Sequence, residues 1–283
     1  MDKVLVFEIK GKHGFFKRHS SSTSPTSYSS ITKTALIGLI SAIIGDFNGN
    51  DSKDNYLDYF NNNNCKISIE VLNPVKKKSF GLNYQNLKDI KPITLKHLSS
   101  IDEKVDDIDK ELILLEDYHK NVGNYDRGNK YTQVNTEVLR EPHYRIYFHH
   151  SDSTIYDLFK NRLENHETYY PTFMGTTDFP CEVFYQGEKQ VSIIKMEEKE
   201  NIKILSIVPE SQAQVITEIK IEGQKPKRLQ NSIKEKQPYL FIKEQDYRRN
   251  KEFIDLTIPM DAEPILCKVG NYCKVDGKNL LFY

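Results

Sequence analysis

Residues 4–18 read VLVFEIKGKHGFFKR and residues 32–45 read TKTALIGLISAIIG, and these two runs decide the fold. The apolar run Val4–Ile9 is nearly continuous, which is typical of a central strand in a sheet. The second run predicts a helix, because Thr32 can cap its first turn and Gly45 can adopt the positive φ angle that ends many helices. The chain therefore begins with a strand, a loop and a helix.

The predicted helix has one apolar face and one unfavourable residue. The apolar side chains recur at helical spacing, at Leu36, Leu39, Ile40 and Ile43. Gly38 lowers helix propensity, so we expect it at a point of close packing on the strand beneath the helix.

A surplus of positive charge lies between the strand and the helix. The whole chain carries 40 Lys and Arg against 40 Asp and Glu, so the surplus is local. No carboxylate occurs between Glu8 and Asp46, whereas this stretch contains Lys10, Lys12, Lys17, Arg18 and Lys33, with His13 and His19 between them. Such a surface attracts a polyanion, and the helix N-terminus beside it offers backbone N–H groups to phosphates. A solvated basic loop beside a core helix is the alternative interpretation.

Several enzyme classes lack their sequence signatures. The loop does not have the Gly-x-x-x-x-Gly-Lys-Ser/Thr spacing, which disfavours a nucleotide triphosphatase. Clustered metal-binding carboxylates are also lacking, which disfavours a metal-dependent nuclease. The four cysteines have no Cys-x-x-Cys spacing, so we expect reduced thiols and neither a metal nor a cofactor at Cys65, Cys181, Cys267 and Cys273.

Five segments resemble, in their order, the CRISPR-associated Cas-five family of the RAMP superfamily, and most closely its type I-B form. They are residues 4–19, 24–28, 32–40, 131–142 and 170–179, which begin with VLVF, SPTSY, TKTAL, YTQVN and YPTF. Each segment is short, but their order is specific. The match covers roughly the first two thirds of the chain.

The resemblance implies a non-catalytic RNA-binding subunit of a type I CRISPR interference complex, Cascade, that acts in antiviral defence. Such a subunit caps the repeat-derived 5′ handle of the CRISPR RNA (crRNA) and helps to nucleate the filament of backbone subunits. The implied partners are the crRNA handle, the backbone subunit, the large subunit and, in the assembled complex, target DNA. Neither a cofactor nor a membrane is implied.

The RNA-binding residues follow from placing this function on the sequence. The expected handle contacts are Lys10, Lys12, His13, Lys17, Arg18 and Lys33, and the expected stacking residues are Phe15, Phe16 and Tyr28. Phe15 and Phe16 are adjacent, so only one of them faces the core. The family has a thumb-like hairpin, which we place near residues 121–140, with RNA contacts at Gln133, Asn135 and Arg140.

A metal-independent endoribonuclease that cuts the CRISPR repeat, as the type I-C relative does, is the alternative function. It needs a general acid and a general base, and the sequence offers these residue types at His13, His19, Tyr28, His143, His149 and His150. The pair His149–His150 lies at a predicted strand end, where histidines are more often structural or solvated. In type I-B systems a separate subunit normally processes the repeat.

The order strand, helix, strand, strand, helix, strand predicts an α+β, ferredoxin-like domain of the RRM-like kind over residues 1–187. Its further elements are a half-buried strand at Ile67–Val71, a strand at Tyr144–His149, a helix at Ser153–Glu164 and a strand at Cys181–Tyr185. Two insertions are an Asn-rich segment, Phe47–Asn64, and an acidic helix, Ser100–Asp117, that we expect to meet a protein partner.

Residues 188–283 show no strong helical period and predict a β-rich extension of short strands. We expect a solvated polar connection between two of these strands, with Lys225, Lys227, Arg228, Lys234 and Lys236. The apolar run Ala35–Ile44 is too short to span a bilayer and the N-terminus has no cleavable signal pattern, so we expect a cytoplasmic protein.

Overall fold

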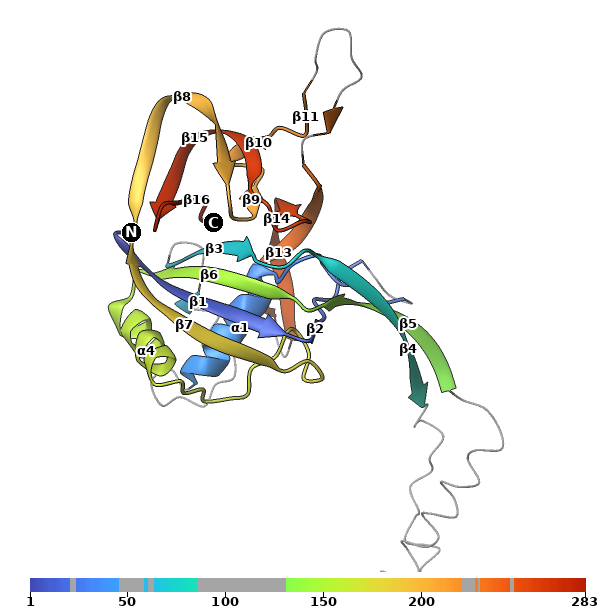
Figure 1. The fold of residues 1–283 in the computed structure, drawn as a ribbon. Coiled ribbons are helices and arrows are strands. Elements are labelled where there is room, and N and C mark those ends of the chain that lie inside the picture. The colour runs from blue at the N-terminus through green and yellow to red at the C-terminus, as the bar shows by residue number, and fades with distance from the viewer. Residues whose placement is uncertain are drawn as a thin grey trace, which may run out of the picture. The chain divides into compact units, whose positions relative to one another are not determined.

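The computed structural model describes residues 1–20, 24–45, 59–60, 64–85, 131–219, 227–228, 230–244 and 247–283 (Figure 1). They fall into two compact units, residues 1–79 with 137–283 and residues 80–136. Strands predominate among them, beside helices α1 (Lys33–Ile44) and α4 (Ser153–Glu164). Most of Phe47–Asn64, the whole of Ser100–Asp117 and residues 121–130 of the predicted thumb lie outside the described residues.

The first unit contains an antiparallel sheet with the strand order β3-β6-β1-β7. β1 spans Lys3–Gly11, β3 Cys65–Val71, β6 His143–His150 and β7 Cys181–Gln190. Helix α1 follows β1 and helix α4 follows β6, so these elements succeed one another in the predicted order. β1 lies inside the sheet, as its continuous apolar run predicts.

At the start of each helix, a side chain caps the first turn by accepting a hydrogen bond from a backbone N–H. The Thr32 hydroxyl accepts a hydrogen bond from the Ala35 N–H at 3.2 Å, and Asp152 caps α4 in the same way through the Thr154 N–H at 2.8 Å. Gly45 ends α1 with φ +85°, and its N–H donates to the Ser41 carbonyl. The predicted caps of α1 are therefore confirmed.

One face of the sheet packs against α1 and α4 and forms the main core. Phe7 of β1 meets Phe159 of α4 edge to face, with 5.3 Å between ring centroids, and Phe148 of β6 meets the same ring at 5.2 Å. Such pairs contribute roughly 0.5–1.5 kcal/mol beyond the burial of their surface. Ile155, Phe159 and Leu163 of α4 are all buried.

C-terminal strands cover the opposite face of the sheet. Val4 and Val6 of β1 pack there against Val275, which ends β15 (Ile265–Val275), and against Leu280, which ends β16 (Lys278–Leu280). Chain segments also cover the outer edge of β3. The Ile67 N–H donates to the Tyr283 carbonyl, and the Ile207 N–H donates to the Ile69 carbonyl. β3 is therefore almost wholly buried, and the prediction of a half-buried strand is wrong.

A set of ion pairs and hydrogen bonds, which we call the sheet-face network, lies on this covered face. Its members are Glu8, Glu70, His143, Arg145, Tyr147 and Lys278. Arg145 bridges both carboxylates, at 2.7 Å to Glu8 and 3.1 Å to Glu70. Burial alone would raise the pKa of Glu8, but hydrogen bonds from Arg145 and His143 hold it below its usual value. Each carboxylate of the network is thus matched by cations.

A second sheet has the order β2-β5-β4. β2 spans His13–Gly14, β4 spans Lys76–Gln85 and β5 spans Tyr131–Arg140. His13 pairs with Arg140 and Gly14 pairs with Leu139. The segment expected to form the end of the thumb is therefore a strand up to Arg140.

The C-terminal third is rich in strands, as predicted, but its strands are longer than the sequence indicates. β13 (Ser232–Glu244) and β14 (Tyr247–Pro259) pair over their length, and β9 (Val208–Pro209) pairs with β14. β8 (Ser192–Ile204) pairs with β15. β15 also pairs with β10 (Ala213–Val215) and with β16, and β11 (Glu218–Ile219) pairs with β12 (Lys227–Arg228).

The predicted basic connection needs correction. Lys234 and Lys236 lie within β13 rather than between strands, and Lys225 lies outside the described residues. The domain boundary at residue 187 stays a prediction. Leu256, Ile258 and Tyr283, which follow that boundary, belong to the same hydrophobic core as the residues of β1. No helix in the described part of the chain is long and apolar enough to cross a membrane.

Candidate nucleic-acid interface

Two of the segments quoted above, residues 4–19 and 131–142, meet at the end of β1. The Gly11 N–H donates to the Pro142 carbonyl at 3.1 Å, and the Glu141 N–H donates to the Lys12 carbonyl at 2.9 Å. The pairing of His13 with Arg140 continues this contact. Residues more than a hundred positions apart in sequence thus form one local structure around the basic loop.

The segment 170–179 packs against the same loop. The Phe15 N–H donates to the Met174 carbonyl at 2.9 Å. Gly175 has φ +94°, and a Cβ atom there would lie 2.0 Å from the Phe15 carbonyl oxygen. Only glycine therefore fits at this point, which explains the Met-Gly pair in the segment.

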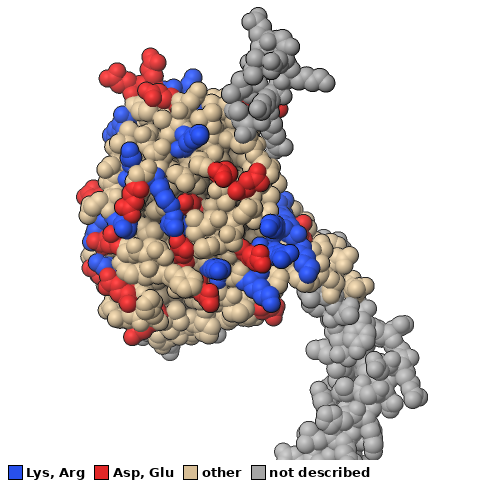
Figure 2. All heavy atoms as spheres, in the orientation of Figure 1, with Lys and Arg blue, Asp and Glu red and all other residues tan. Residues whose placement is uncertain are grey.

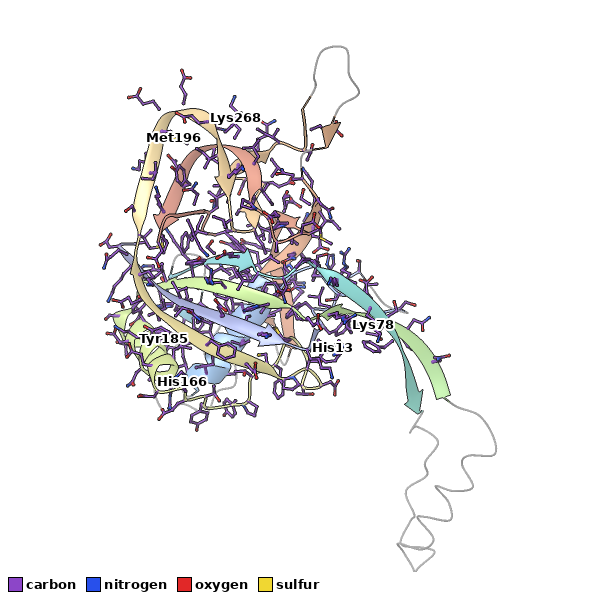
Figure 3. All side chains as sticks on the ribbon, in the orientation of Figure 1. His13, Lys78, His166, Tyr185, Met196 and Lys268 are labelled. Carbon is purple, nitrogen blue, oxygen red and sulfur yellow. The ribbon has the colours of Figure 1, made fainter. Side chains whose placement is uncertain are left out.

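A basic cluster of Lys12, His13, Lys78 and Arg140 surrounds the β2–β5 pairing. Burial lowers the pKa of His13, and the charges of Lys12, Lys78 and Arg140 lower it further, so the imidazole is neutral at pH 7. Figure 2 shows Lys and Arg side chains gathered near β2 and the start of β4, and Figure 3 places His13 and Lys78 there. Positive charge is therefore concentrated around His13.

Three of the predicted phosphate contacts are exposed. Lys10, Lys12 and Lys17 point to solvent, and no carboxylate of the described residues forms an ion pair with them. Arg140 is also exposed, although it lies 3.7 Å from Glu141. These side chains are available to a polyanion.

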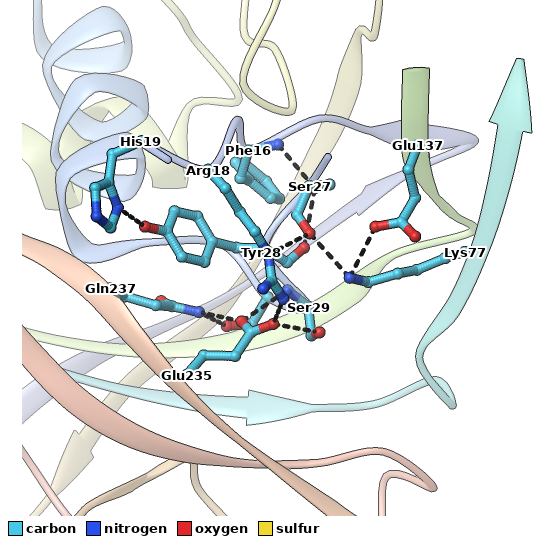
Figure 4. Close-up of polar contacts among 11 residues, drawn as sticks. Phe16, Arg18, His19, Ser27, Tyr28, Ser29, Lys77, Glu137, Glu235 and Gln237 are labelled. Atoms are coloured by element: carbon cyan, nitrogen blue, oxygen red, sulfur yellow. Dashed lines mark hydrogen bonds and ion pairs between the residues drawn. The ribbon is translucent and has the colours of Figure 1, made fainter. Parts of the chain in front are cut away.

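Arg18 differs from these lysines, because it is held by a carboxylate. It forms an ion pair with Glu235 of β13, which also accepts hydrogen bonds from the Ser29 N–H at 2.9 Å and the Ser29 hydroxyl at 2.7 Å (Figure 4). Gln237 donates to the same carboxylate at 3.1 Å. We call this set the Glu235 clamp. Its charge is internally balanced, so Arg18 anchors the loop rather than offering a free cation.

Lys77 provides a second anchor for the loop. Its ammonium group donates to the Ser27 carbonyl at 2.9 Å and pairs with Glu137 at 3.0 Å (Figure 4). The Glu137 N–H in turn donates to the Pro25 carbonyl at 2.9 Å. Lys77 therefore has a structural role within the run Lys76–Lys78.

The aromatic residues divide as their adjacency predicts. Phe16 is buried and Phe15 is half-buried, so one of the two faces the core. Tyr28 is buried, and its hydroxyl meets His19 Nδ1 at 2.8 Å (Figure 4). Phe15 is thus the better-placed stacking residue, and the expectation that Phe16 and Tyr28 present open faces is wrong.

Lys33 is the clearest departure from the predicted site. Its side chain is 1% exposed, and its ammonium group lies 4.0 Å from the centre of the Tyr239 ring without a hydrogen-bond partner among the described residues. Burial lowers the pKa of Lys33 to about 8. A cation enclosed in this way does not reach a phosphate, because the first turn of α1 faces the β13–β14 hairpin.

A pocket of about 720 Å³ opens beside the loop, within the first unit. Its aromatic lining residues are Phe15, Phe16, Tyr28, Phe173 and Phe241, and Lys17, Arg18 and His19 lie along its rim, where Lys17 is the cation without a carboxylate partner among the described residues. The floor is the face of α1 with Ala35, Gly38 and Ala42. A Cβ atom on Gly38 would meet nothing within 4 Å, so the prediction of close packing there is wrong. The missing side chain leaves a hollow instead.

The predicted thumb residues Gln133 and Asn135 lie on β5 in the unit of residues 80–136. Both side chains are exposed, and they share one face of the strand because they are two residues apart. Arg140 ends the same strand in the other unit.

The three remaining histidines that the sequence offers as an acid or a base have structural partners. His143 Nε2 lies 2.8 Å from Glu8, His149 Nδ1 lies 3.1 Å from the Lys3 carbonyl, and His150 Nε2 lies 2.7 Å from the Tyr59 carbonyl. The structural interpretation of the pair His149–His150 is thereby supported.

Sequence reasoning missed the residues of the C-terminal wall. Pro238, Phe241 and Asn250 line the pocket from β13 and β14, and Glu235 of β13 pairs with Arg18, but no motif marks any of these four residues. Phe173 was within reach, since it belongs to the quoted segment 170–179. Long-range pairing brings the other four to the loop, and a local pattern does not encode that.

No protein-family model matches the chain, and no curated protein matches it. Among solved structures, it is similar to a CRISPR protein from Archaeoglobus fulgidus, with 13% identity, 98% of this chain and 97% of that chain covered, and a TM-score of 0.49.

Two further similar structures come from larger assemblies. One is a chain of a CRISPR RNA-guided surveillance complex, with 10% identity, 93% and 91% of the two chains covered, and a TM-score of 0.46. The other is a chain of the type III-B Cmr-β complex bound to cognate target RNA and AMPPnP, with 10% identity, 94% and 86% covered, and a TM-score of 0.36. These neighbours are CRISPR-associated proteins. At such low identities and TM-scores the likeness carries no argument about what this chain binds.

Proposed function

We propose that this chain is a non-catalytic RNA-binding subunit of a type I CRISPR interference complex, and that it caps the 5′ handle of the crRNA. The observation that carries the proposal is the pairing of a cationic, carboxylate-poor loop with an aromatic pocket beside it. Exposed lysines attract the phosphate backbone and aromatic rings accept unstacked bases, which together are the elements of single-strand binding.

The electrostatics favour the loop over the rest of the surface. The chain has no net formal charge, so it does not attract nucleic acid everywhere. Lys10, Lys12 and Lys17 are exposed without a carboxylate partner among the described residues, and the basic cluster adds Lys78 and Arg140. The local field therefore directs an RNA strand to the end of β1.

The architecture also favours the loop over the open-sheet mode of RNA binding. We propose that β3, β6, β1 and β7 with α1 and α4 form a ferredoxin-like unit, whose RRM-like relatives stack bases on the exposed sheet face. Here Val275, Leu280 and Phe282 cover part of that face, and the sheet-face network neutralises its charged residues. RNA must then bind elsewhere.

The remaining parts of the assignment belong to the same proposal. Contact with a backbone subunit, a large subunit and target DNA and the thumb near 121–140 rest on the sequence resemblance, and the cytoplasmic location stays the expectation from the sequence pattern. Gln133 and Asn135 are exposed, which agrees with a role in RNA contact.

A metal-independent endoribonuclease is the second candidate, and one contact favours it. His19 and Tyr28 lie 2.8 Å apart at a pocket rimmed by Lys17 and Arg18, which are residue types that serve cleavage at a 2′-hydroxyl. Burial raises the pKa of Tyr28, so its hydroxyl remains protonated and is a weak acid at neutral pH. Tyr28 is therefore a poor acid–base partner for His19 in this contact.

The test mixes the protein with a labelled CRISPR repeat RNA in EDTA and resolves the products on a native gel and a denaturing gel. The proposal predicts a shifted complex containing intact RNA. A discrete cut that disappears in His19→Ala would replace the proposal with the endoribonuclease. Absence of a shift at all protein concentrations would contradict both functions.

A further inference from the structure

The pocket beside the loop is built from two distant parts of the chain. The segment Phe15–His19 and helix α1 form one side, and the β13–β14 hairpin provides Pro238, Phe241 and Asn250 on the other. The Glu235 clamp fixes this hairpin to the loop. The C-terminal third therefore completes the pocket.

The pocket has the size and lining of a small-ligand site. A volume of about 720 Å³ lies inside the range of roughly 300–1,000 Å³ that such sites occupy. Phe15, Phe173 and Phe241 offer flat apolar surfaces. Gly38 leaves the helix surface open, because nothing lies within 4 Å of where its Cβ atom would be.

Two polar atoms in the lining await a partner. Thr176 Oγ1 and Asn250 Oδ1 are buried, and neither has a hydrogen-bond partner among the described residues. A buried polar atom without a partner costs about 1–3 kcal/mol, which makes such atoms rare in folded proteins. Because both residues line the pocket, a rotation of either side chain would turn its polar atom toward a ligand there, and hydrogen-bonding groups at the ligand's edge would satisfy it.

The ligand must combine three properties. It needs a flat ring for the aromatic walls, donors or acceptors at the ring edge for Thr176 and Asn250, and a negative charge for the rim at Lys17. A nucleotide unit of a single strand has all three. An aromatic protein side chain has the ring but neither the array of edge groups nor the anionic link.

We propose that this pocket holds one unpaired nucleobase of the bound RNA, and that Asn250 and Thr176 select that base by contacting its edge. The inference rests on the proposed function and adds a specificity site to which the C-terminal third contributes. The phosphate beside the held nucleotide then lies at Lys17, and the neighbouring nucleotides follow the exposed lysines.

The test uses repeat RNA that carries the fluorescent base 2-aminopurine at one position at a time, because its emission rises when the base leaves the stack of its neighbours. We expect one position to respond on binding. Gly38→Leu should fill the pocket, abolish that response and weaken RNA affinity by about tenfold, the scale of one lost base–aromatic contact. Gly38→Ala is the matched control and should retain the response, since one methyl group leaves the pocket open.

A second variant tests the selection of the base. Asn250→Ala should leave the protein folded and the position responsive, while the difference in affinity between the four natural bases at that position shrinks several-fold. Thermal melting of all three variants shows that each is folded.

The outcomes separate the inference from the function on which it rests. Tight RNA binding with no responsive position, or with a response that survives Gly38→Leu, overturns the pocket and leaves the RNA-binding function standing. Failure of the unaltered protein to bind the RNA overturns both, and leaves an aromatic side chain of a protein partner as the occupant to test.

Discussion

The sheet-face network and the basic loop use the same residue types in opposite ways. In the network, Arg145 and Lys278 meet the carboxylates of Glu8 and Glu70 at 2.7–3.1 Å under a cover of C-terminal strands. In the loop, Lys12 and Lys17 are exposed, and no carboxylate of the described residues pairs with them. The pairing of charge, and not the number of cations, distinguishes a structural region from one that is open to a ligand.

The difference has an energetic basis. Removing one partner from a buried ion pair leaves an uncompensated charge and costs stability, whereas removing an exposed lysine costs little. Changes in the network should therefore alter folding alone, and changes in the loop should alter RNA binding alone. Each prediction below tests one side of that separation.

The largest effect is expected inside the network. Glu70→Ala should lower the free energy of unfolding by about 3–5 kcal/mol, because Arg145 and Lys278 then lose a buried counter-charge. Urea denaturation measures the change. Glu188→Ala is the control, since Glu188 pairs with Lys3 and Lys160 nearer the surface and its loss should cost less. Equal losses in the two variants would contradict the account of the network.

The Glu235 clamp is a buried ion pair that anchors the basic loop, so its loss should affect both stability and RNA binding. Glu235→Gln keeps the shape but removes the charge that holds Arg18 and Ser29, and should cost about 1–3 kcal/mol of stability. RNA affinity should also fall several-fold, since the loop loses its anchor. Glu210→Gln on the exposed pair with Lys234 is the matched control and should change neither quantity appreciably. Unaltered RNA affinity in Glu235→Gln would show that the clamp does not shape the site.

The pH dependence of stability tests whether Lys33 is a buried structural residue rather than an RNA contact. Its pKa is about 8 in the folded protein and near 10.5 when exposed, so the unfolded chain binds more protons between these values. Stability should therefore rise with pH in that window, where the cost of the buried charge is relieved. Lys33→Met should be more stable than the parent by about 1–3 kcal/mol at pH 7, and its advantage should shrink above pH 8. Weaker RNA binding by the variant would show that Lys33 contributes to the RNA-binding site.

The smallest effect is expected for a single exposed lysine. Lys17→Gln should reduce the slope of log affinity against log salt by about 0.7, the contribution of one phosphate contact on a single strand. Melting temperature should not change. A slope equal to that of the parent protein would remove Lys17 from the interface.

Much of this fold is local in origin, and local patterns predict it. Thr32, Gly45 and the apolar spacing of α1 gave the helix its bounds, and the apolar run of β1 indicated an inner strand. β3 was misjudged because its alternating Ser68 and Glu70 look solvated in sequence. They are buried, and Glu70 is paired with residues 75 and 208 positions away.

The sequence predicts the exposed cations of the candidate site but not the distant residues that line its pocket. The carboxylate-poor loop identified Lys12 and Lys17 correctly as exposed, whereas Lys33 has the same local signal and is buried by Tyr239. Phe241 and Asn250 reach the pocket through a long hairpin. No sequence pattern reports which distant strand covers a helix.

One comparison tests the central claim most directly. The affinity of a single-stranded repeat RNA is measured, at fixed low salt, for Lys12→Glu/Lys17→Glu and for Lys195→Glu/Lys268→Glu, which makes the same change in charge on exposed lysines of β8 and β15. The account predicts at least about tenfold weaker binding for the loop variant and no more than about a twofold change for the control, with equal melting temperatures. Equal losses in both variants would mean that RNA responds to total charge, and no loss in either would mean that the loop does not bind RNA.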